Sequence, residues 1–297
     1  MSNRRQFVTS VITLPPAIQL TTSLAKAGTI IHVADFNVVA DGLNDDSTAL
    51  QAAIIAAQNN ELHIAKGTYL CRSSLLVPSN SRITLDPQAV LIQPNKGLAS
   101  TFTIAPNSQN IVIQGGKLYG PYRNGMPTWL DQTTNKLSNG DTWQALAENI
   151  GIHIQGRWHQ REIQQLPLRE MKQLTDESRN ISIRNIEIMG FGQSGILADQ
   201  VTDCQFINNI IHQCGRDGIR LYGAKNCQVM DNKISDIAPG YGGAYPNWNV
   251  YGITCTRIYG KLPDYPDPDL RLFRASGQVK VEGNTIVTSP LASTMMA

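Results

Sequence analysis

Nine residues recur three times without a gap, as Asn180-Ile-Ser-Ile-Arg-Asn-Ile-Glu-Ile188, Asp203-Cys-Gln-Phe-Ile-Asn-Asn-Ile-Ile211 and Asn226-Cys-Gln-Val-Met-Asp-Asn-Lys-Ile234. Successive copies start 23 residues apart. Looser copies lie at 110–118 and 279–286. A second short pattern accompanies them and opens on Gly-Ile each time, at 151–155, 195–199, 218–222 and 252–256.

Both patterns alternate apolar and polar residues, which is typical of a strand buried on one face. A repeat of this length with two short strands and no helical pattern predicts a solenoid, here an all-β parallel β-helix. Stacked rungs about 4.8 Å apart would place equivalent residues in columns. The inward columns are expected to be Ile181, Cys204 and Cys227, then Ile183, Phe206 and Val229, then Ile188, Ile211 and Ile234.

Polar residues recur at the turns of this repeat. Asn209, Asn232 and Asn284 occupy one turn position, where stacked amides can bridge rungs and bind backbone groups. The five cysteines form no metal-type pair such as Cys-x-x-Cys. Cys204 and Cys227 are adjacent in the predicted stack, where a free pair of small interior residues is favoured over a disulfide.

Composition excludes several classes of protein. Charged residues make up only 16% of the chain and apolar residues 41%, which fits neither a coiled coil nor a disordered chain. The formal net charge is +2 and no block of Lys or Arg is present, so no nucleic-acid partner is expected.

Residues 1–27 read as an export signal. Arg4-Arg5 precedes Phe7 and a mildly apolar stretch, and Ala25-Lys26-Ala27 supplies a small-x-small cleavage pattern. The paired arginines resemble a twin-arginine signal, which predicts a periplasmic or secreted protein. The stretch is too short and too polar for a membrane span. Residues 28–297 are then the β-helix domain.

The two ends of the predicted β-helix differ. Asp45-Asp46-Ser47-Thr48 supplies helix N-cap chemistry, and Leu50, Ala53, Ile54 and Ala57 share one helical face. This short helix would cover the unpaired strand edges of the first rung. No equivalent is visible after Val287, so either the chain is a fragment or a loop or partner covers the last rung. A trimer or a capped end would do so, and the oligomeric state stays open.

The N-terminal residues resemble a known superfamily. Asp35-Phe36-Asn37-Val38, Asp41-Gly42 and the run from Asn44 to Ile54 are similar to the opening of the pectate-lyase-like proteins. Leu62-His-Ile-Ala-Lys-Gly-Thr-Tyr69 resembles the strand that follows there. The resemblance implies a right-handed parallel β-helix acting most often on an acidic polysaccharide. It does not identify the reaction, since one fold serves many functions.

The signatures of particular subfamilies are missing. The sequence lacks the polygalacturonase set of Asn-Thr-Asp, Asp-Asp and Gly-His-Gly, and it lacks the Asp-Pro-His element of secreted alginate epimerases. The several Asp residues that hold calcium in pectate lyases are not recognisable. No cofactor is predicted, although calcium stays possible.

Aromatic residues concentrate in four segments that interrupt the repeat, roughly 119–148, 157–178, 238–249 and 257–276. They hold all four tryptophans, and flat aromatic faces in a cleft suit sugar rings. Packing of the loops onto the β-helix is the alternative. The predicted substrate-binding residues are Trp129, Trp143, Tyr241, Tyr245 and Trp248 from these segments, with Arg216 and Tyr251 beside them.

The second repeated strand also predicts a catalytic group. Its outward positions bring together His153, Asp199, Asp217, Arg220 and Tyr222. On a uronate, an Arg would neutralise the carboxylate, a base would remove the C5 proton and a Tyr or Asp would protonate the leaving oxygen. For hydrolysis, Asp199 and Asp217 form the best carboxyl pair.

Each of these residues also has a structural interpretation. Asp217 precedes a glycine, where Asp commonly binds its own turn, Arg220 could pair with Asp199, and His153 could be an incidental surface histidine. Two functions therefore remain. The first is a secreted polysaccharide lyase or glycoside hydrolase, and the second is a non-catalytic glycan-binding or envelope-associated β-helix.

Overall fold

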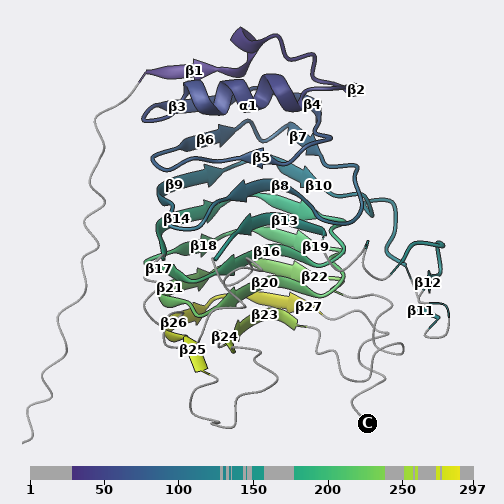
Figure 1. The fold of residues 1–297 in the computed structure, drawn as a ribbon, viewed down its shortest axis with the longest axis vertical. Helices are drawn as coiled ribbons and strands as arrows, with labels where there is room; N and C mark the ends of the chain where they lie inside the picture. Colours follow the sequence, from purple (N-terminus) through teal and green to yellow (C-terminus); the bar gives the residue numbers. More distant parts are fainter. Residues whose placement is uncertain are drawn as a thin grey trace, which may run out of the picture.

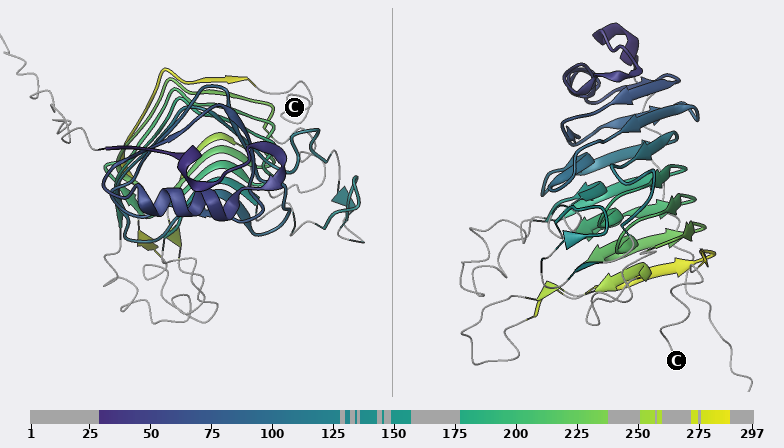
Figure 2. Two further views of the ribbon diagram at one scale, coloured as in Figure 1. Left: turned by 90° about the horizontal axis from the view of Figure 1, so that it is seen from above. Right: turned by 90° about the vertical axis from the view of Figure 1, so that its right-hand side faces the viewer.

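The structure is a computed structural model, and it describes residues 29–127, 130–131, 134, 136–142, 145, 149–156, 177–237, 251–256, 258–259, 272–274 and 276–287. Its strands stack in parallel rungs around one core (Figure 1). Seen from above, the rungs superpose as a closed outline with three sides (Figure 2). The predicted all-β parallel β-helix is confirmed.

Three parallel sheets form the sides. Sheet A contains β1 (Ile30–His32), β3 (Glu61–Ile64), β6 (Arg82–Leu85), β9 (Gln109–Gln114), β14 (Ser178–Arg184), β17 (Val201–Thr202), β18 (Gln205–Ile207), β21 (Lys225–Met230) and β26 (Gly277–Glu282). Sheet B contains β2 (Asp41–Asp45), β4 (Gly67–Leu70), β7 (Ala89–Ile92), β10 (Lys117–Tyr119), β15 (Glu187–Met189), β19 (Ile210–His212), β22 (Lys233–Ser235) and β27 (Thr285–Val287). Sheet C contains β5 (Leu75–Leu76), β8 (Ala99–Ile104), β13 (Asn149–Ile154), β16 (Ser194–Asp199), β20 (Asp217–Tyr222) and β23 (Tyr251–Thr256).

Two short antiparallel pairs lie outside these sheets. They are β11 (Leu130–Asp131) with β12 (Lys136–Leu137), and β24 (Ile258–Tyr259) with β25 (Leu272–Arg274). In the described part of the chain, no helix is both long and apolar enough to cross a membrane. The predicted export signal, residues 1–27, lies outside the described residues.

The repeats have the register that their alignment predicts. Phe206 pairs with both Ile183 and Val229, and Ile211 pairs with both Ile188 and Ile234. All three predicted columns are buried, including Cys204 and Cys227, and both of these thiols are free. The segment 62–69, predicted as one strand, instead forms the end of β3 and most of β4, because the chain turns from sheet A to sheet B there.

The asparagines at the turn form a hydrogen-bonded ladder. Asn232 Oδ1 accepts from the backbone N–H and the side-chain amide of Asn209, at 2.9 and 3.0 Å. Asn284 Oδ1 binds Asn232 in the same way, at 3.0 and 2.8 Å. Each side-chain amide also donates to a carbonyl of the preceding rung. The ladder satisfies buried backbone groups at a corner that no strand pairing reaches.

A glycine column explains why the second repeat opens on Gly. A Cβ at Gly195 would lie 2.5 Å from Ile211 Cγ2, and one at Gly218 would lie 2.7 Å from Ile234 Cγ2. Gly151 and Gly252 face isoleucines at similar distances. The isoleucines of sheet B therefore fill the corner where each chain turn enters sheet C, and no larger residue fits there.

A helix closes the N-terminal end. Helix α1 (Ser47–Ala56) takes the place of a sheet C strand in the first rung and buries Leu50, Ala53 and Ile54, with Ala57 buried just beyond it. A short 3-10 helix, η1 (Val33–Phe36), packs beside α1. Gln51 donates to Leu76 O at 2.9 Å and accepts from Leu76 N at 2.7 Å, so its amide binds the free edge of β5.

The N-cap chemistry of α1 differs from the prediction. Asp46 is the N-cap residue but makes no side-chain cap bond, because its carboxylate accepts from the backbone N–H groups of Val39 and Ala40. Asp45 instead accepts from the backbone N–H of Ser47 at 3.1 Å. The Asp46 carboxylate thus links the start of α1 to the loop that contains Val39 and Ala40.

Candidate active site

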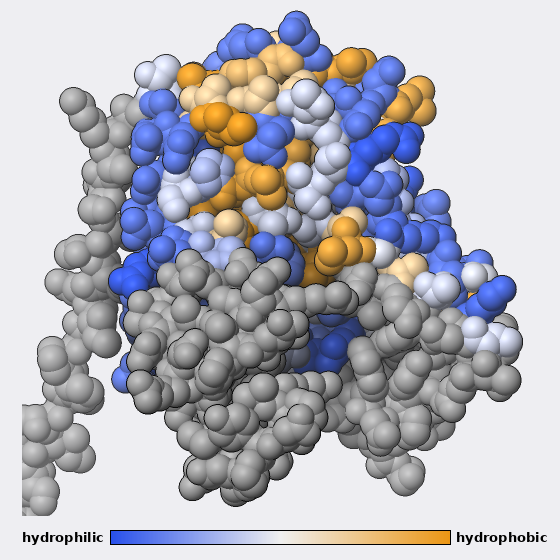
Figure 3. Space-filling model, in the orientation of Figure 1, coloured by the Kyte–Doolittle hydropathy of each residue, from blue (hydrophilic) through white to orange (hydrophobic). Residues whose placement is uncertain are grey.

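The outward positions of sheet C form the columns that the sequence predicts. His153 pairs with Leu197, Leu197 with Arg220 and Arg220 with Thr254, so these four side chains cross four rungs. Asp199 pairs with Tyr222 and Thr256 in the next column. Figure 3 views this face and shows hydrophobic residues gathered near its middle, over α1 and the first sheet C strands. The charged residues lie farther along, in β16 and β20.

The carboxylate of Asp217 is the centre of the cluster. Its Oδ2 atom lies 2.6 Å from Arg220 Nη1 and 3.7 Å from Arg216 Nε, and its Oδ1 atom accepts from Thr254 Oγ1 at 2.6 Å. Asp217 is 0% exposed and Arg220 is 8% exposed. Burial raises the pKa of Asp217, and the charges of Arg220 and Arg216 oppose that rise.

Tyr222 extends the cluster toward β16. The guanidinium carbon of Arg220 lies 4.8 Å from the centre of the Tyr222 ring, a cation–π distance. Burial raises the pKa of Tyr222, and Arg220 opposes this. The phenol therefore stays protonated at neutral pH and can act as a proton donor.

His153 and Asp199 form a second pair on the same face. His153 Nε2 lies 3.5 Å from Asp199 Oδ2, with the histidine 8% exposed and the aspartate fully buried. His153 is thus not an incidental surface residue. The alternative pairing of Arg220 with Asp199 is not what the structure has, since Arg220 binds Asp217.

The register separates the two carboxylates proposed for hydrolysis. Asp199 lies opposite Tyr222, whereas Asp217 lies opposite Ser194 at the other end of the same strand pair. Five residues of strand correspond to roughly 16 Å. Glycosidase carboxyl pairs lie at most about 9.5 Å apart, so this pair fits hydrolysis poorly.

The predicted substrate-binding residues are only partly described. Arg216 lies in the cluster, and Tyr251 lies in β23 opposite Asp217 with 43% of its surface exposed. Trp129, Trp143, Tyr241, Tyr245 and Trp248 lie outside the described residues, so the aromatic cleft stays a prediction. Within the described ranges, no group of three His, Cys, Asp or Glu side chains could hold a metal ion.

Sequence reasoning missed two features. The first is the hydrogen bond that Thr254 Oγ1 donates to Asp217 Oδ1. A second polar cluster lies on sheet B, where Glu187 binds Lys117 Nζ at 2.9 Å and Tyr119 OH at 3.1 Å, and lies 3.5 Å from His212 Nε2. Lys117 and Glu187 are 70 positions apart because an inserted segment interrupts the repeat, so no fixed period revealed their contact.

A family model described as a right-handed β-helix region matches residues 174–289. The chain has the right-handed β-helix fold of the pectate-lyase-like superfamily. This β-helix is similar to the polygalacturonase of Erwinia carotovora, with a TM-score of 0.55 and 12% identity over 90% of this chain and 65% of the other. It is also similar to an exopolygalacturonase from Thermotoga maritima, with a TM-score of 0.55 and 14% identity over 88% of this chain and 60% of the other.

Sequence similarity points to a further relative of the β-helix. Mannuronan C5-epimerase AlgE3 of Azotobacter vinelandii is 23% identical over 231 residues, which cover 72% of this chain and 12% of the epimerase. The chain therefore spans about an eighth of this curated relative. These likenesses establish the fold, and the chemistry must be argued from the residues of the site.

Proposed function

We propose that this β-helix acts on an acidic polysaccharide by removing the C5 proton of a uronate residue. The observation that carries the proposal is the joint placement of Arg216, Arg220 and Tyr222 with the His153–Asp199 pair on the outer face of sheet C. The names of the relatives support the substrate class, since mannuronan and polygalacturonan are both uronic acid polymers.

Each residue of the cluster has a distinct role in the proposed removal of the C5 proton. Arg216 and Arg220 attract the uronate carboxylate, and partial neutralisation of that group makes the C5 proton more acidic. His153, oriented by Asp199, accepts the proton while the C–H electron pair moves into the carboxyl group. In a lyase, those electrons then form the C4–C5 double bond and expel the glycosidic oxygen, which takes a proton from Tyr222. In an epimerase, a proton returns to the other face of C5.

Access to these groups is expected from the C-terminal side. Asp217 and Asp199 are fully buried, so they position other groups rather than contact substrate. Tyr251 and the partly exposed side chains of Arg216 and Thr254 lie at the C-terminal border of the cluster. A sugar bound over β20 and β23 would reach Arg216 first.

Deuterium exchange at C5 tests the proposal. The purified protein is incubated in D2O with polymannuronate, polyguluronate and polygalacturonate, and NMR follows loss of the C5 proton signal while ultraviolet absorbance follows double bonds. We expect exchange with one of these polymers. Absorbance rising with exchange identifies a lyase, and exchange without absorbance identifies an epimerase.

Two histidine variants provide a matched control. His153→Asn should slow exchange by about 100-fold, in the usual range for loss of a general base. His212→Asn should leave the rate unchanged, although His212 also lies 3.5 Å from a carboxylate. Equal rates in the two variants would remove His153 from the reaction.

The burial of the cluster favours a second function, glycan binding without turnover. Asp217, satisfied by Arg220 and Thr254, could simply hold sheet C together under a binding surface. Under that function, calorimetry detects binding of the uronate polymer while no C5 proton exchanges. Arg216→Ala would then weaken binding, and His153→Asn would not.

A further inference from the structure

Two histidines of sheet A face each other, away from the candidate active site on sheet C. His32 in β1 lies directly opposite His63 in β3, in a parallel register that also pairs Ile31 with Leu62. Ile31 packs against the core and Leu62 is fully buried, so the histidines that alternate with them point outward. His32 is exposed and His63 is half-buried. Figure 1 shows both strands at the α1 end of the β-helix.

The two imidazole rings have no other role in the described structure. Their centres lie 5.7 Å apart and their planes meet at 76°. Within the part of the chain that the structure describes, neither His32 nor His63 has a hydrogen bond from its side chain or an ion pair. His153 and His212, by contrast, each lie 3.5 Å from a carboxylate. The ring nitrogens of the sheet A pair are therefore available to a ligand from solution.

The distance between the rings suits two imidazoles on one metal ion. A ring nitrogen binds such an ion at about 2.0–2.1 Å, which places the ring centre about 3.2 Å from the ion. Two rings on one ion then have centres about 4.5 Å apart for a right angle at the ion and about 6.4 Å apart for a straight one. The observed 5.7 Å lies between these limits. Rotation about the side-chain bonds can thus bring one nitrogen of each ring to the same ion while the backbone stays in place.

The backbone holds the pair in position before any ligand arrives. Strands β1 and β3 pair over three residues, and the N–H of Glu61 also donates to Thr29 O at 3.3 Å. Because the strand pairing fixes both backbones, binding of an ion orders only two side chains. Once one imidazole has bound, the other meets the ion at a high effective concentration.

The chemistry of the ligands selects the kind of ion. Imidazole nitrogen suits Cu²⁺, Ni²⁺ and Zn²⁺, and Cu²⁺ generally binds most tightly, whereas Ca²⁺ and Mg²⁺ prefer oxygen ligands. The described residues add no third His, Cys, Asp or Glu to the pair. Water or a group from another molecule would therefore fill the remaining positions on the ion.

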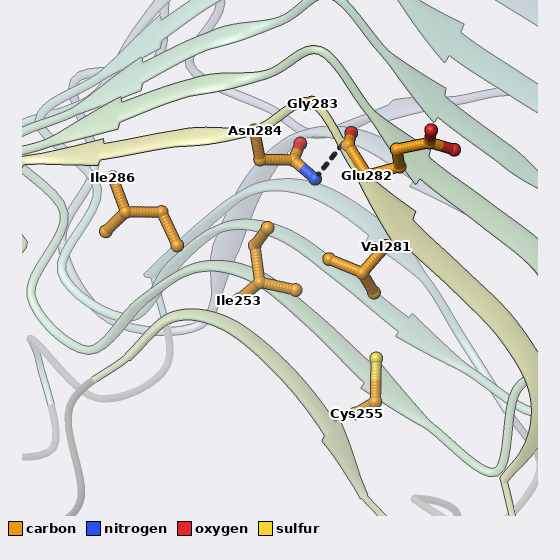
Figure 4. A pocket seen from close by; sticks show the side chains of 7 residues that line it. All are labelled: Ile253, Cys255, Val281, Glu282, Gly283, Asn284 and Ile286. Atoms are coloured by element: carbon orange, nitrogen blue, oxygen red, sulfur yellow. Dashed lines mark hydrogen bonds between the residues drawn. The ribbon is translucent and has the colours of Figure 1, made fainter.

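The hollow between β23, β26 and β27 is a poorer place for a metal ion. It has a volume of about 460 Å³. Figure 4 shows Cys255 among the apolar side chains of Ile253, Val281 and Ile286, with the Glu282 side chain directed away. Burial raises the pKa of Cys255 to about 11, so its thiol stays protonated at neutral pH, and the thiolate is the form that binds metal.

We propose that His32 and His63 form a surface site for a divalent transition-metal ion, and that the bound ion links β1 to β3. The site does not depend on the reaction proposed for sheet C, because it lies on a different sheet. Strand β1 contributes only three residues to sheet A. An ion that binds both strands stabilises their pairing in proportion to its affinity and concentration.

Copper titration of histidine variants tests the site. The full chain is purified without a histidine tag and titrated with Cu²⁺ by calorimetry, and electron paramagnetic resonance identifies the nitrogens bound. We expect one such ion per chain, held by two imidazole nitrogens. His32→Asn and His63→Asn should each weaken this binding by about 100-fold, because each removes one of two linked ligands. His212→Asn is the matched control and should bind Cu²⁺ like the unchanged protein.

Hydrogen exchange with Zn²⁺ tests the link between the strands. Peptides that contain residues 30–32 should exchange more slowly when Zn²⁺ saturates the unchanged protein. The same peptides of the double variant His32→Asn/His63→Asn should exchange at a rate that Zn²⁺ does not alter. Ca²⁺ should slow exchange in neither protein. Circular dichroism confirms that each variant folds, and the melts should match because both side chains lie outside the core.

Four results would overturn the proposal. Equal Cu²⁺ binding by the unchanged protein and the double variant would mean that other residues hold the ion. Weaker binding in only one of the two single variants would mean that one imidazole acts with a different group. Displacement of Cu²⁺ by an equal concentration of Ca²⁺ would indicate oxygen ligands. Unaltered exchange of residues 30–32 at saturating Zn²⁺ would show that the ion does not join the two strands.

Discussion

The β-helix carries two clusters of similar composition on different sheets. On sheet C, Asp217 and Asp199 are buried together with Arg220 and His153, and the partly buried Tyr222 lies beside them. On sheet B, the partners Lys117, Tyr119 and His212 surround Glu187, which water still reaches. Each cluster contains a carboxylate, a cation, a tyrosine and a histidine 3.5 Å from a carboxylate. The two clusters therefore differ in burial rather than in residue type. Burial decides how strongly the charged groups interact and how far their pKa values shift.

The largest difference is expected in stability. Arg220→Ala leaves the Asp217 carboxylate buried, with Thr254 and Arg216 as its remaining partners among the described residues, so the free energy of unfolding should fall by about 3 kcal/mol. Lys117→Ala removes the matching partner on sheet B and should cost less than about 1 kcal/mol, because that pair is partly exposed. Urea denaturation followed by circular dichroism measures both. Equal losses would mean that the two clusters are equivalent.

The next difference concerns the tyrosines. Tyr222→Phe retains the ring that stacks on Arg220 but removes the proton donor, so uronate conversion should slow by about 100-fold at an unchanged melting temperature. Tyr119→Phe removes a hydrogen bond to Glu187 and should leave the rate unaltered. Rates on the active polymer, measured side by side, test this. A slower rate for the Tyr119→Phe variant would instead place the reactive site on sheet B.

The smallest expected difference is in how the stability of each cluster depends on pH. Bonds from Lys117, Tyr119 and His212 outweigh the burial of Glu187 and lower its pKa from the ordinary 4.5. A lowered folded-state pKa adds stability above the unfolded value and loses it as the pH falls through the folded value. The Glu187→Gln variant should therefore have a lower free energy of unfolding than the unchanged protein at pH 7. This difference in free energy should narrow below about pH 4.5.

The buried cluster should behave in the opposite sense. Burial raises the pKa of Asp217, so proton uptake favours the folded state as the pH falls toward the pKa that Asp217 has in the unfolded chain.

Urea titration across acidic pH tests the prediction for Glu187. It measures the free energies of unfolding of Glu187→Gln and of the unchanged protein, and their difference is compared from one pH to the next. A gap that widens with acid would contradict the lowered pKa of Glu187.

The fold could be predicted closely from the sequence because its rules are local and repeat. Alternation defines the inward columns, and the 23-residue period sets the register of β14, β18 and β21. Asn209 and Asn232 fall in the ladder for the same reason. The cap of α1 was predicted in kind but not in detail, because the partner of Asp46 lies in a loop outside the helix.

The site could be predicted only in part. The column of His153, Leu197 and Arg220 follows from the repeat, but outward residues are normally solvated, so their burial has no signal in the pattern. The pairing of Thr254 with Asp217 depends on the direction of two side chains. The sheet B cluster joins residues across an insertion, and periodicity cannot register a contact of that kind.

The side chain of Gln51 has a consequence for the design of solenoids. A primary amide carries an acceptor oxygen beside N–H donors, and here the Gln51 oxygen accepts from the N–H of Leu76 while its nitrogen donates to the C=O of Leu76. A single glutamine on a covering helix thus imitates part of the missing neighbouring strand. A helix that carries such a residue could terminate other parallel coils without adding a further rung.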